Sequence, residues 1–372
     1  MKVLADARGA HRTFPVLDLL RGIAAIAVLG RHFGRSILDV FPNSYLAVDL
    51  FFMLSGFVMA NAYEHRLSNG LSLRAFARIR VVRLYPMYAL GTLLSVFAMV
   101  AFGLDGPINW HAFVVGIGCA VFFIPALAGL SFDQQSLFPF NRPAWSLWFE
   151  LAINALYAVI ARWLSWRVLV FVLCVGLVLL ASLCASHGNL DAGWRTTQIF
   201  SGLSRILFSY FAGVAIFRLR KVGVLGRLAL SPVLAAIVLL FTFALRFDVS
   251  AISDFLIVVV VFPLLIAAST NDPGSRADPV FRWLGAVSYP LYATQGAYVG
   301  AVRRELDRIG GQGQWKGYVI EVAVLAMAAV GAWLVSIYVD GPIRSWLTKR
   351  DAARHPDGLN VAGGVVTPPG VE

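Results

Sequence analysis

The residues best suited to chemistry lie within one apolar stretch near the start of the chain. This stretch, VLDLLRGIAAIAVLGRHFG at residues 16–34, carries Asp18, Arg21 and His32. On an α-helix, Arg21 and His32 share a face about three turns apart, which is roughly 17 Å. Asp18 lies one turn before Arg21 on nearly the same face, whereas Arg31 points elsewhere. Because histidine is the side chain best suited to proton transfer near neutral pH, the stretch can perform acid–base chemistry.

Two simpler interpretations of the same residues remain open. Ionisable groups within a membrane are costly, so they usually face a protein interior and serve a function. Asp18 and Arg21 could instead form an ion pair that only packs, and His32 could sit at the outer interface of the membrane. The stretch alone does not decide between these interpretations.

A second candidate site is the pair Arg80 and Arg83 in RIRVVRLYPMYAL, where a basic loop enters a hydrophobic segment. The two residues are one turn apart, and we expect them at the cytoplasmic start of a helix, where the helix dipole also favours an anion. Two guanidinium groups so placed suit a phosphate or pyrophosphate. The alternative is that they only mark the cytoplasmic side and contact anionic lipid. We favour the anion site, because the pair enters the hydrophobic segment instead of stopping before it.

Polar side chains also interrupt two other hydrophobic segments. Asp49 and an SGF triplet that begins at Ser55 occur in the second segment. Small residues allow close packing of membrane helices, which is the simplest interpretation of the triplet, whereas Asp49 needs an interior partner. The segment PAWSLWFELAINALY contains Trp145, Ser146 and Glu150. Ser146 and Glu150 share a helix face, because they are spaced i, i+4. A glutamate buried in a membrane helix needs a partner or a function.

The composition identifies the chain as a membrane protein. Of its 372 residues, 59% are hydrophobic and only 14% are charged, and the mean hydropathy is +0.75. Hydrophobic runs of about 20 residues recur along the chain, which is the length needed to cross a bilayer. This pattern excludes a soluble globular protein of this size.

The net charge of +11 does not indicate a nucleic-acid partner. Lys and Arg lie mostly in short loops between hydrophobic runs, as the positive-inside rule describes. We therefore expect the lipid bilayer as a partner and no nucleic acid. Cys119, Cys174 and Cys184 lie in or beside hydrophobic runs without metal-ligand spacing, so no metal site is predicted.

The hydrophobic runs predict an all-α, polytopic membrane helical bundle of about ten transmembrane helices. Residues 112–130 are an exception, because they are rich in Gly, contain Pro125 and lack flanking positive charge. A full crossing here would place the basic turn at 162–167 outside the cell, against the positive-inside rule. We therefore expect one re-entrant or broken segment at 112–130.

The chain is expected to form a membrane-embedded domain at 1–348 and a disordered cytoplasmic tail at 349–372, where Gly and Pro are frequent. Both termini are expected in the cytoplasm. The first span is predicted to be retained rather than cleaved as a signal peptide, because Arg21 interrupts its apolar core and no clear cleavage site follows. The arginines within 303–308 do not fit the charge rule.

Six motifs, taken in order, resemble the acyltransferase-3 family of integral-membrane O-acyltransferases. They are LDLLRGIAAIAVLGRH, LAVDLFFMLSGFVMA, RIRVVRLYPMYAL, PAWSLWFELAINALY, WLGAVSYPLYATQ and YVDGP. The resemblance extends from Leu17 to Pro342, which is nearly the whole chain. Each motif alone is weak, but six in the right order are specific.

The resemblance implies an enzyme of the bacterial cytoplasmic (inner) membrane that transfers a small acyl group, often acetyl. The donor would be cytoplasmic acyl-CoA, used as a co-substrate with no bound cofactor, and the acceptor a hydroxyl of a glycan or lipid-linked sugar. No further catalytic domain is visible outside the membrane, so we expect the acceptor chemistry to be completed within the membrane domain or by a partner protein. The competing class is a secondary transporter or flippase with a path of buried charges, although no inverted repeat is visible.

The matching positions give the predicted site. Catalytic roles fall to His32, Arg21 and Glu150, and donor binding falls to Arg80 and Arg83. Substrate contact or structural support is predicted for Asp18, Asp49, Ser55, Trp145, Ser146 and Tyr289. His32 would act either as a general base or as a transient carrier of the acyl group.

The chain departs from the family pattern at two positions. Gln295 stands where members commonly carry a histidine, and an amide cannot exchange protons at neutral pH. Asp340, followed by Gly341, stands where a glutamate usually precedes the proline, which keeps the charge but shortens its reach.

Overall fold

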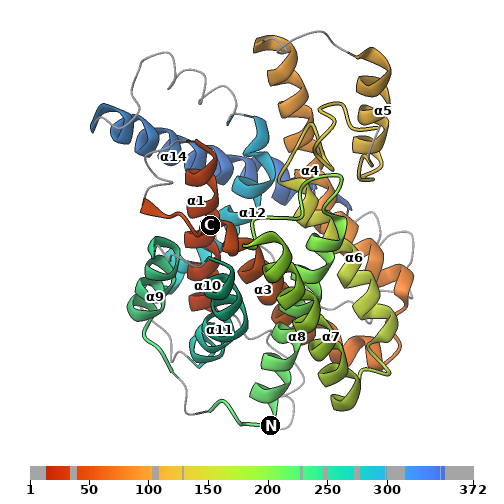
Figure 1. The fold of residues 1–372 in the computed structure, drawn as a ribbon, viewed down its shortest axis with the longest axis vertical. Helices are drawn as coiled ribbons and strands as arrows, with labels where there is room; N and C mark the ends of the chain where they lie inside the picture. The colour runs from red at the N-terminus through yellow and green to blue at the C-terminus, as the bar shows by residue number, and fades with distance from the viewer. Residues whose placement is uncertain are drawn as a thin grey trace.

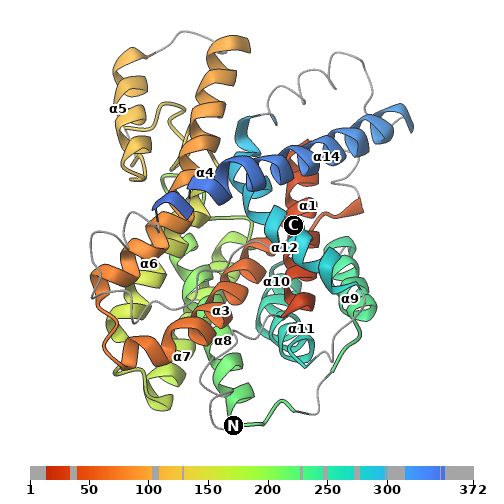
Figure 2. The same ribbon diagram turned by 180° about the vertical axis from the view of Figure 1, so that it is seen from behind.

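The computed structural model describes ten stretches of the chain: 14–33, 40–102, 109–127, 130–226, 229–245, 250–271, 277–297, 299, 315–343 and 345–347. Within them the fold is a bundle of helices, and the only β-type pairing is one isolated bridge between Ser136 and Arg195. Figures 1 and 2 show the helices packed around one another from opposite sides. The predicted all-α membrane bundle is confirmed. The tail predicted at 349–372 and the arginines within 303–308 lie outside the described residues.

The elements follow one another with short connections. They are α1 (Pro15–Phe33), the 3₁₀ turn η1 (Ser44–Leu46), α3 (Ala47–Ser68), α4 (Leu73–Phe102), α5 (Trp110–Val121), α6 (Ala144–Ile160), α7 (Trp166–His187), α8 (Ile199–Lys221), α9 (Pro232–Ala244), α10 (Ser250–Leu256), the π-helical turn η2 (Ile257–Val261), α11 (Phe262–Ser269), α12 (Asp278–Thr294), α14 (Trp315–Val335) and the π-helical turn η3 (Ser336–Asp340).

Each of the ten predicted spans contains a helix, but the helices are unequal. In the described part of the chain, six stretches are long and apolar enough to cross a membrane: Ser44–Ser68, Leu73–Ala101, Trp166–His187, Ile199–Lys221, Ser250–Ser269 and Gly317–Leu347. Helix α1 is long enough but carries three charged residues. Helices α6, α9 and α12 have 17, 13 and 17 residues. The expected number of ten full spans therefore exceeds the six that length and composition support.

Helix α5 crosses only part of a bilayer. Its 12 residues extend about 18 Å, against an apolar thickness of about 30 Å. Its last carbonyls need donors, because lipid supplies none. Two tyrosines of α4 provide them: the Tyr85 hydroxyl donates to the Val121 carbonyl at 2.6 Å, and the Tyr88 hydroxyl donates to the Ala120 carbonyl at 2.7 Å. The chain then returns to α6 without regular helix, as expected for a re-entrant or broken segment.

Small residues bring the central helices together. A Cβ on Gly56 of α3 would overlap the carbonyl oxygen of Tyr210, and a Cβ on Gly213 of α8 would overlap that of Met53. The backbones of α3 and α8 therefore touch at the SGF triplet, as the packing interpretation predicts. Helices α1 and α12 interlock in the same way, since Gly285 has Asp18 within 2.6 Å of its Cβ position.

Candidate functional site

Three elements, α3, α4 and α6, meet at a largely buried ionic group. Arg80 of α4 places Nη2 3.3 Å from Oε1 of Glu150 on α6. Ser55 of α3 donates its hydroxyl to the same oxygen at 2.7 Å. The Arg80 side chain is 3% exposed, and that of Glu150 is 20% exposed. The structure therefore brings three predicted site residues together and gives the buried glutamate two partners.

The two arginines of the predicted phosphate site differ in their surroundings. Helix α4 begins at Leu73, seven residues before Arg80, so neither arginine lies in the first turn, where the helix dipole is felt. Arg80 is buried on Glu150, whereas Arg83 is exposed. The pair is thus not a symmetric clamp at a helix start, which differs from the expectation. Arg80 keeps its Nε without a hydrogen-bond partner among the described atoms.

A cationic cluster lies next to this group. Asp18 and Arg21 of α1 form a loose ion pair at 3.8 Å. Asp18 also interacts electrostatically with Arg83 and with Arg282 of α12. Three arginines from three helices therefore surround one carboxylate, which leaves an excess of positive charge. Arg282 was missed from the sequence, although it enters a hydrophobic segment in the same way as Arg83.

Ser146 and Tyr289 hold α12 in place. The Ser146 hydroxyl lies 2.7 Å from the Tyr292 hydroxyl and donates to the Pro143 carbonyl at 3.1 Å. The Tyr289 hydroxyl donates to the carbonyl of Leu84 on α4. Ser146 therefore does not share the partners of Glu150, although both lie on one face of α6.

Asp49 has a partner that sequence reasoning missed. Arg205 of α8 donates to both carboxylate oxygens of Asp49, at 2.6 and 3.2 Å, and both side chains are at most 2% exposed. Arg205 also donates to the carbonyls of Ala192 and Tyr45, and it lies 5.5 Å above the Trp145 ring. Because the donors of Arg205 are satisfied, we interpret the ion pair of Asp49 and Arg205 as structural. The signal was one arginine in the middle of an otherwise plain hydrophobic span.

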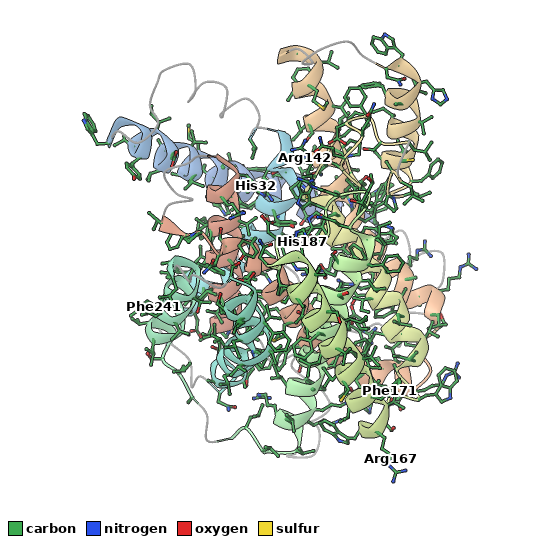
Figure 3. All side chains as sticks on the ribbon, viewed as in Figure 1. His32, Arg142, Arg167, Phe171, His187 and Phe241 are labelled. Carbon is green, nitrogen blue, oxygen red and sulfur yellow. The ribbon has the colours of Figure 1, made fainter. Side chains whose placement is uncertain are left out.

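His32 lies at the other end of α1. It occupies the last turn of the helix, and its side chain is exposed. The helix is continuous from Arg21 to His32, so the two residues are separated by roughly 17 Å along the axis. Figure 3 shows His32 in the upper centre of the molecule, near the height of Arg142 and far from Arg167 at the opposite end. The structure thus places two centres at the two ends of α1.

Arg31, the residue before His32, is held by several contacts. Arg31 pairs with Asp191 at 2.7 Å and donates to the Pro42 carbonyl at 2.8 Å. Its guanidinium carbon lies 5.0 Å from the centre of the Tyr45 ring. These contacts anchor the end of α1 to the segments before α3 and α8, and so they hold the backbone that carries His32.

The segment between α5 and α6 contains one strongly held carboxylate, Asp133. Burial raises the pKa of Asp133, but hydrogen bonds from Ser136, Gln135 and Ser131 outweigh it and hold this pKa below its ordinary 3.8. Arg142 adds an ion pair at 3.4 Å. Within the described residues no cluster of three or more His, Cys, Asp or Glu side chains could hold a metal.

Comparison with known proteins gives this arrangement a context. The family model described as "Acyltransferase domain" matches residues 14–337. "Protein 2 in picA locus" from Rhizobium radiobacter is 39% identical over 165 residues, which are 40% of this chain and 82% of that protein. "Peptidoglycan O-acetyltransferase OatA" from Listeria monocytogenes is 24% identical over 317 residues, or 77% of this chain and 49% of that protein.

A third relative is "Acyltransferase MdmB" from Streptomyces mycarofaciens, 28% identical over 152 residues, or 37% of this chain and 36% of that protein. The match therefore spans about half of the Listeria protein and about a third of the Streptomyces protein. No solved structure matches the chain.

Proposed function

Because this chain belongs to the acyltransferase-3 family, whose model covers residues 14–337, we propose that it is an integral-membrane O-acyltransferase. It moves a small acyl group from cytoplasmic acyl-CoA to a hydroxyl of a glycan or lipid-linked sugar, and acetyl is the first candidate for that group. The family membership favours an enzyme over the transporter or flippase that the buried charges alone would allow. The single observation that carries the proposal is the separation of a cationic centre and an exposed histidine at the two ends of α1.

The inner centre suits the phosphates of the donor. Arg83 and Arg282 are exposed, and with Arg21 they surround Asp18 with more positive than negative charge. Guanidinium groups bind phosphate oxygens through charge-assisted hydrogen bonds. Arg80 contributes its remaining Nε, while Glu150 and Ser55 fix its orientation. Glu150 is therefore proposed to position Arg80 rather than to exchange a proton with substrate.

The outer centre suits the acceptor. The arm of the donor that ends in the thioester would follow α1 from the cationic cluster toward His32. This path would bring the thioester to the outer half of the bundle. His32 takes the proton of the acceptor hydroxyl, whose oxygen attacks the thioester carbonyl. The carbon–sulfur bond breaks, an ester forms, and CoA leaves as a thiolate that receives the proton. Transient acyl transfer to His32 itself is the second route.

Arg21 lies too far from His32 to contact a thioester that reacts there. Its position beside Asp18 and Arg83 supports a role in orienting the donor. The alternative role, stabilising the thioester oxygen as negative charge develops, would require the reaction to take place at the inner end of α1.

The relatives guide the choice of acceptor and location. A relative named as a peptidoglycan O-acetyltransferase supports transfer to a sugar hydroxyl, and another named as an acyltransferase supports acyl transfer in general. We propose that the enzyme lies in the bacterial cytoplasmic membrane with both termini in the cytoplasm. In this orientation the loops rich in Lys and Arg face the cytoplasm, as the positive-inside rule describes. A partner protein would complete delivery of the acceptor.

The test is turnover of acetyl-CoA by purified protein in lipid nanodiscs, followed as release of free CoA thiol. The wild-type protein should consume acetyl-CoA, whereas a variant with His32→Ala should not exceed background. Arg167→Gln, an exposed arginine on the opposite end of the molecule, is the control and should behave as wild type. If the folded wild-type protein releases no CoA with any acceptor offered, the proposed function is wrong.

A further inference from the structure

Gln295 has a buried side-chain amide that makes no hydrogen bond within the described part of the chain. Its side chain is 1% exposed, and neither its nitrogen nor its oxygen has a partner among the described atoms. Leaving such a group unpaired is costly, so buried amides are nearly always bonded to protein, water or ligand. We therefore expect the Gln295 amide to bind a polar group other than the described protein atoms.

Two more unpaired atoms lie at the same end of α12. Ser95 of α4 and Asn141 of the segment before α6 are 3% and 2% exposed. The Ser95 hydroxyl and the Asn141 side-chain oxygen also have no partner among the described atoms. A Cβ on Gly296, the residue after Gln295, would lie 3.0 Å from the Ser95 hydroxyl and 3.1 Å from the Asn141 oxygen. Ser95 and Asn141, from two elements, thus place unused polar atoms against the backbone of the residue that follows Gln295.

The orientation of Asn141 is fixed. Its side-chain nitrogen donates to the Ala293 carbonyl at 3.1 Å and to the Thr92 hydroxyl at 3.4 Å. The amide therefore cannot turn to satisfy its oxygen without losing these bonds. The unpaired oxygen is a built feature of this position.

This group lies at the level of His32. Helices α1 and α12 interlock at Gly22, which contacts Leu284, and at Gly285, which contacts Asp18. The helices run in the same direction. Helix α1 begins beside Phe57, midway along α3, and ends beside Tyr45 in η1, just before α3. Helix α12 contacts Leu84 through Tyr289 and Gly91 through Ala293, so it runs along α4, which follows α3 in the opposite direction. His32 is ten residues beyond Gly22, and Gln295 is ten residues beyond Gly285. Both residues therefore lie about 15 Å above the same crossing point.

Gln295 also continues an interior stripe of α12. Ser288, Tyr292 and Gln295 follow one another at spacings of four and three residues, which places them on one helix face. Tyr292 bonds to Ser146 inside the bundle, so Gln295 lies one turn beyond that bond on the same side.

We propose that Gln295, Ser95 and Asn141 form the acceptor subsite of the enzyme, an inference that rests on the proposed function. The three side chains are uncharged and offer both donors and acceptors. This chemistry matches neutral neighbouring hydroxyls, each of which can donate and accept, as in a neutral sugar. The subsite holds the acceptor ring so that one further hydroxyl reaches His32. Gln295 is a specificity residue in this scheme and exchanges no proton.

The test measures acceptor kinetics separately from donor turnover. Protein in nanodiscs is supplied with acetyl-CoA and a panel of neutral sugars, namely glucose, N-acetylglucosamine and their β-1,4 disaccharides. Gln295→Leu should raise the KM of the best sugar about tenfold or more, because up to three hydrogen bonds are lost. Its kcat at saturating sugar should change much less than its KM. The melting temperature should not fall, since leucine leaves no unpaired amide.

Two matched pairs of variants separate the subsite from general packing. Ser95→Ala should raise the sugar KM, whereas Ser269→Ala, another buried hydroxyl without a described partner, should not. Gly296→Ala should fill the subsite and raise the KM, whereas Gly331→Ala, whose Cβ would meet nothing within 4 Å, should not. Unchanged KM in Gln295→Leu and Ser95→Ala would show that the atoms bind only water and would overturn the subsite. Acetyl-CoA hydrolysis without acetylation of any neutral sugar would refute its chemistry, and no release of CoA by the wild-type protein would refute the proposed function and the subsite together.

Discussion

Arg80 and Arg205 are both buried arginines paired with a carboxylate, yet their remaining donors differ. The nitrogens of Arg205 donate hydrogen bonds to Asp49 and to two backbone carbonyls. Arg80 has one described carboxylate partner, Glu150, and an unused Nε. A satisfied buried charge specifies structure, whereas an incompletely satisfied one can still bind a ligand. On this ground we propose that Arg80 binds substrate and that Arg205 only stabilises the fold.

The two centres of α1 should give kinetic defects of different kinds. Arg83→Gln or Arg282→Gln removes a charge-assisted contact worth about 1.5–3 kcal/mol, so the KM for acetyl-CoA should rise roughly ten- to hundredfold. His32→Ala should instead lower kcat by roughly 10²–10⁴-fold with little change in donor affinity, as loss of a general base does.

Titration of acetyl-CoA on folded variants measures both effects, with Arg167→Gln as the control. Near-normal kcat in His32→Ala would remove the catalytic assignment. Normal donor KM in both arginine variants would remove the inner phosphate site.

The buried pair of Asp49 and Arg205 should dominate the stability of the central helices. Asp49→Ala leaves an unpaired buried guanidinium, so the free energy of unfolding should fall by about 3–5 kcal/mol. Arg142→Ala breaks a pair in which the arginine is 62% exposed, and it should cost at most about 1 kcal/mol. Thermal unfolding in detergent compares the two. Equal losses would contradict the structural role of the Asp49 pair.

At the scale of elements, periodicity and charge were enough to place most helices. The Gly-rich run with Pro125 marked the segment that contains α5 as an incomplete crossing, because its glycines, its proline and its uncharged flanks disagreed with a full span. The start of α4 could not be predicted. No helix breaker separates LRAFARI from the hydrophobic segment, and its arginines suggested a basic loop. The partners Arg205 and Arg282 were missed for another reason: a pairing between distant helices leaves no spacing in the sequence, only two isolated charges.

Helix α5 depends on two hydroxyls. Changing both Tyr85 and Tyr88 to Phe removes the side-chain donor of the Val121 carbonyl and one of the two donors of the Ala120 carbonyl, which keeps the N–H of Phe123. In an apolar environment we expect a cost of about 1–3 kcal/mol, mainly at the Val121 carbonyl. The melting temperature should fall, and protease should cut the segment after Val121 first. Tyr318→Phe on an exposed face of α14 is the control. Unchanged protease resistance in the double variant would show that the caps do not hold α5.

The segment between α5 and α6 should respond to acid through Asp133. The pKa of Asp133 in the folded protein is below its ordinary 3.8, so its stabilising effect is complete above that value. The effect is lost as the pH falls through the lower, folded pKa. Asp133→Asn should therefore lower stability at pH 7 and lose less than wild type on acidification. Parallel unfolding curves from pH 7 to pH 3 for the two proteins would contradict this.

At the scale of the whole molecule, the proposed function requires α1 to link the two sides of a membrane. If the donor site is cytoplasmic, the loop after α3 must lie on the cytoplasmic side and the segment before α6 on the outer side. A cysteine in place of exposed Gln135 should then react with an impermeant reagent added outside intact cells, and one in place of exposed Ser68 should not. Ser136 in the same segment is fully buried and is unsuitable for labelling. The reverse pattern would invert the topology.

The contact between Asp49 and Arg205 also governs how the protein is made. The two residues are 156 positions apart, so the ribosome must complete four intervening helices before α8 emerges. At about 5–20 residues per second, Asp49 waits roughly 8–30 s for its partner. A carboxylate alone in lipid would be costly throughout that interval. We therefore expect α3 to stay beside the insertion machinery after its own synthesis and to be released into the bilayer only together with α8.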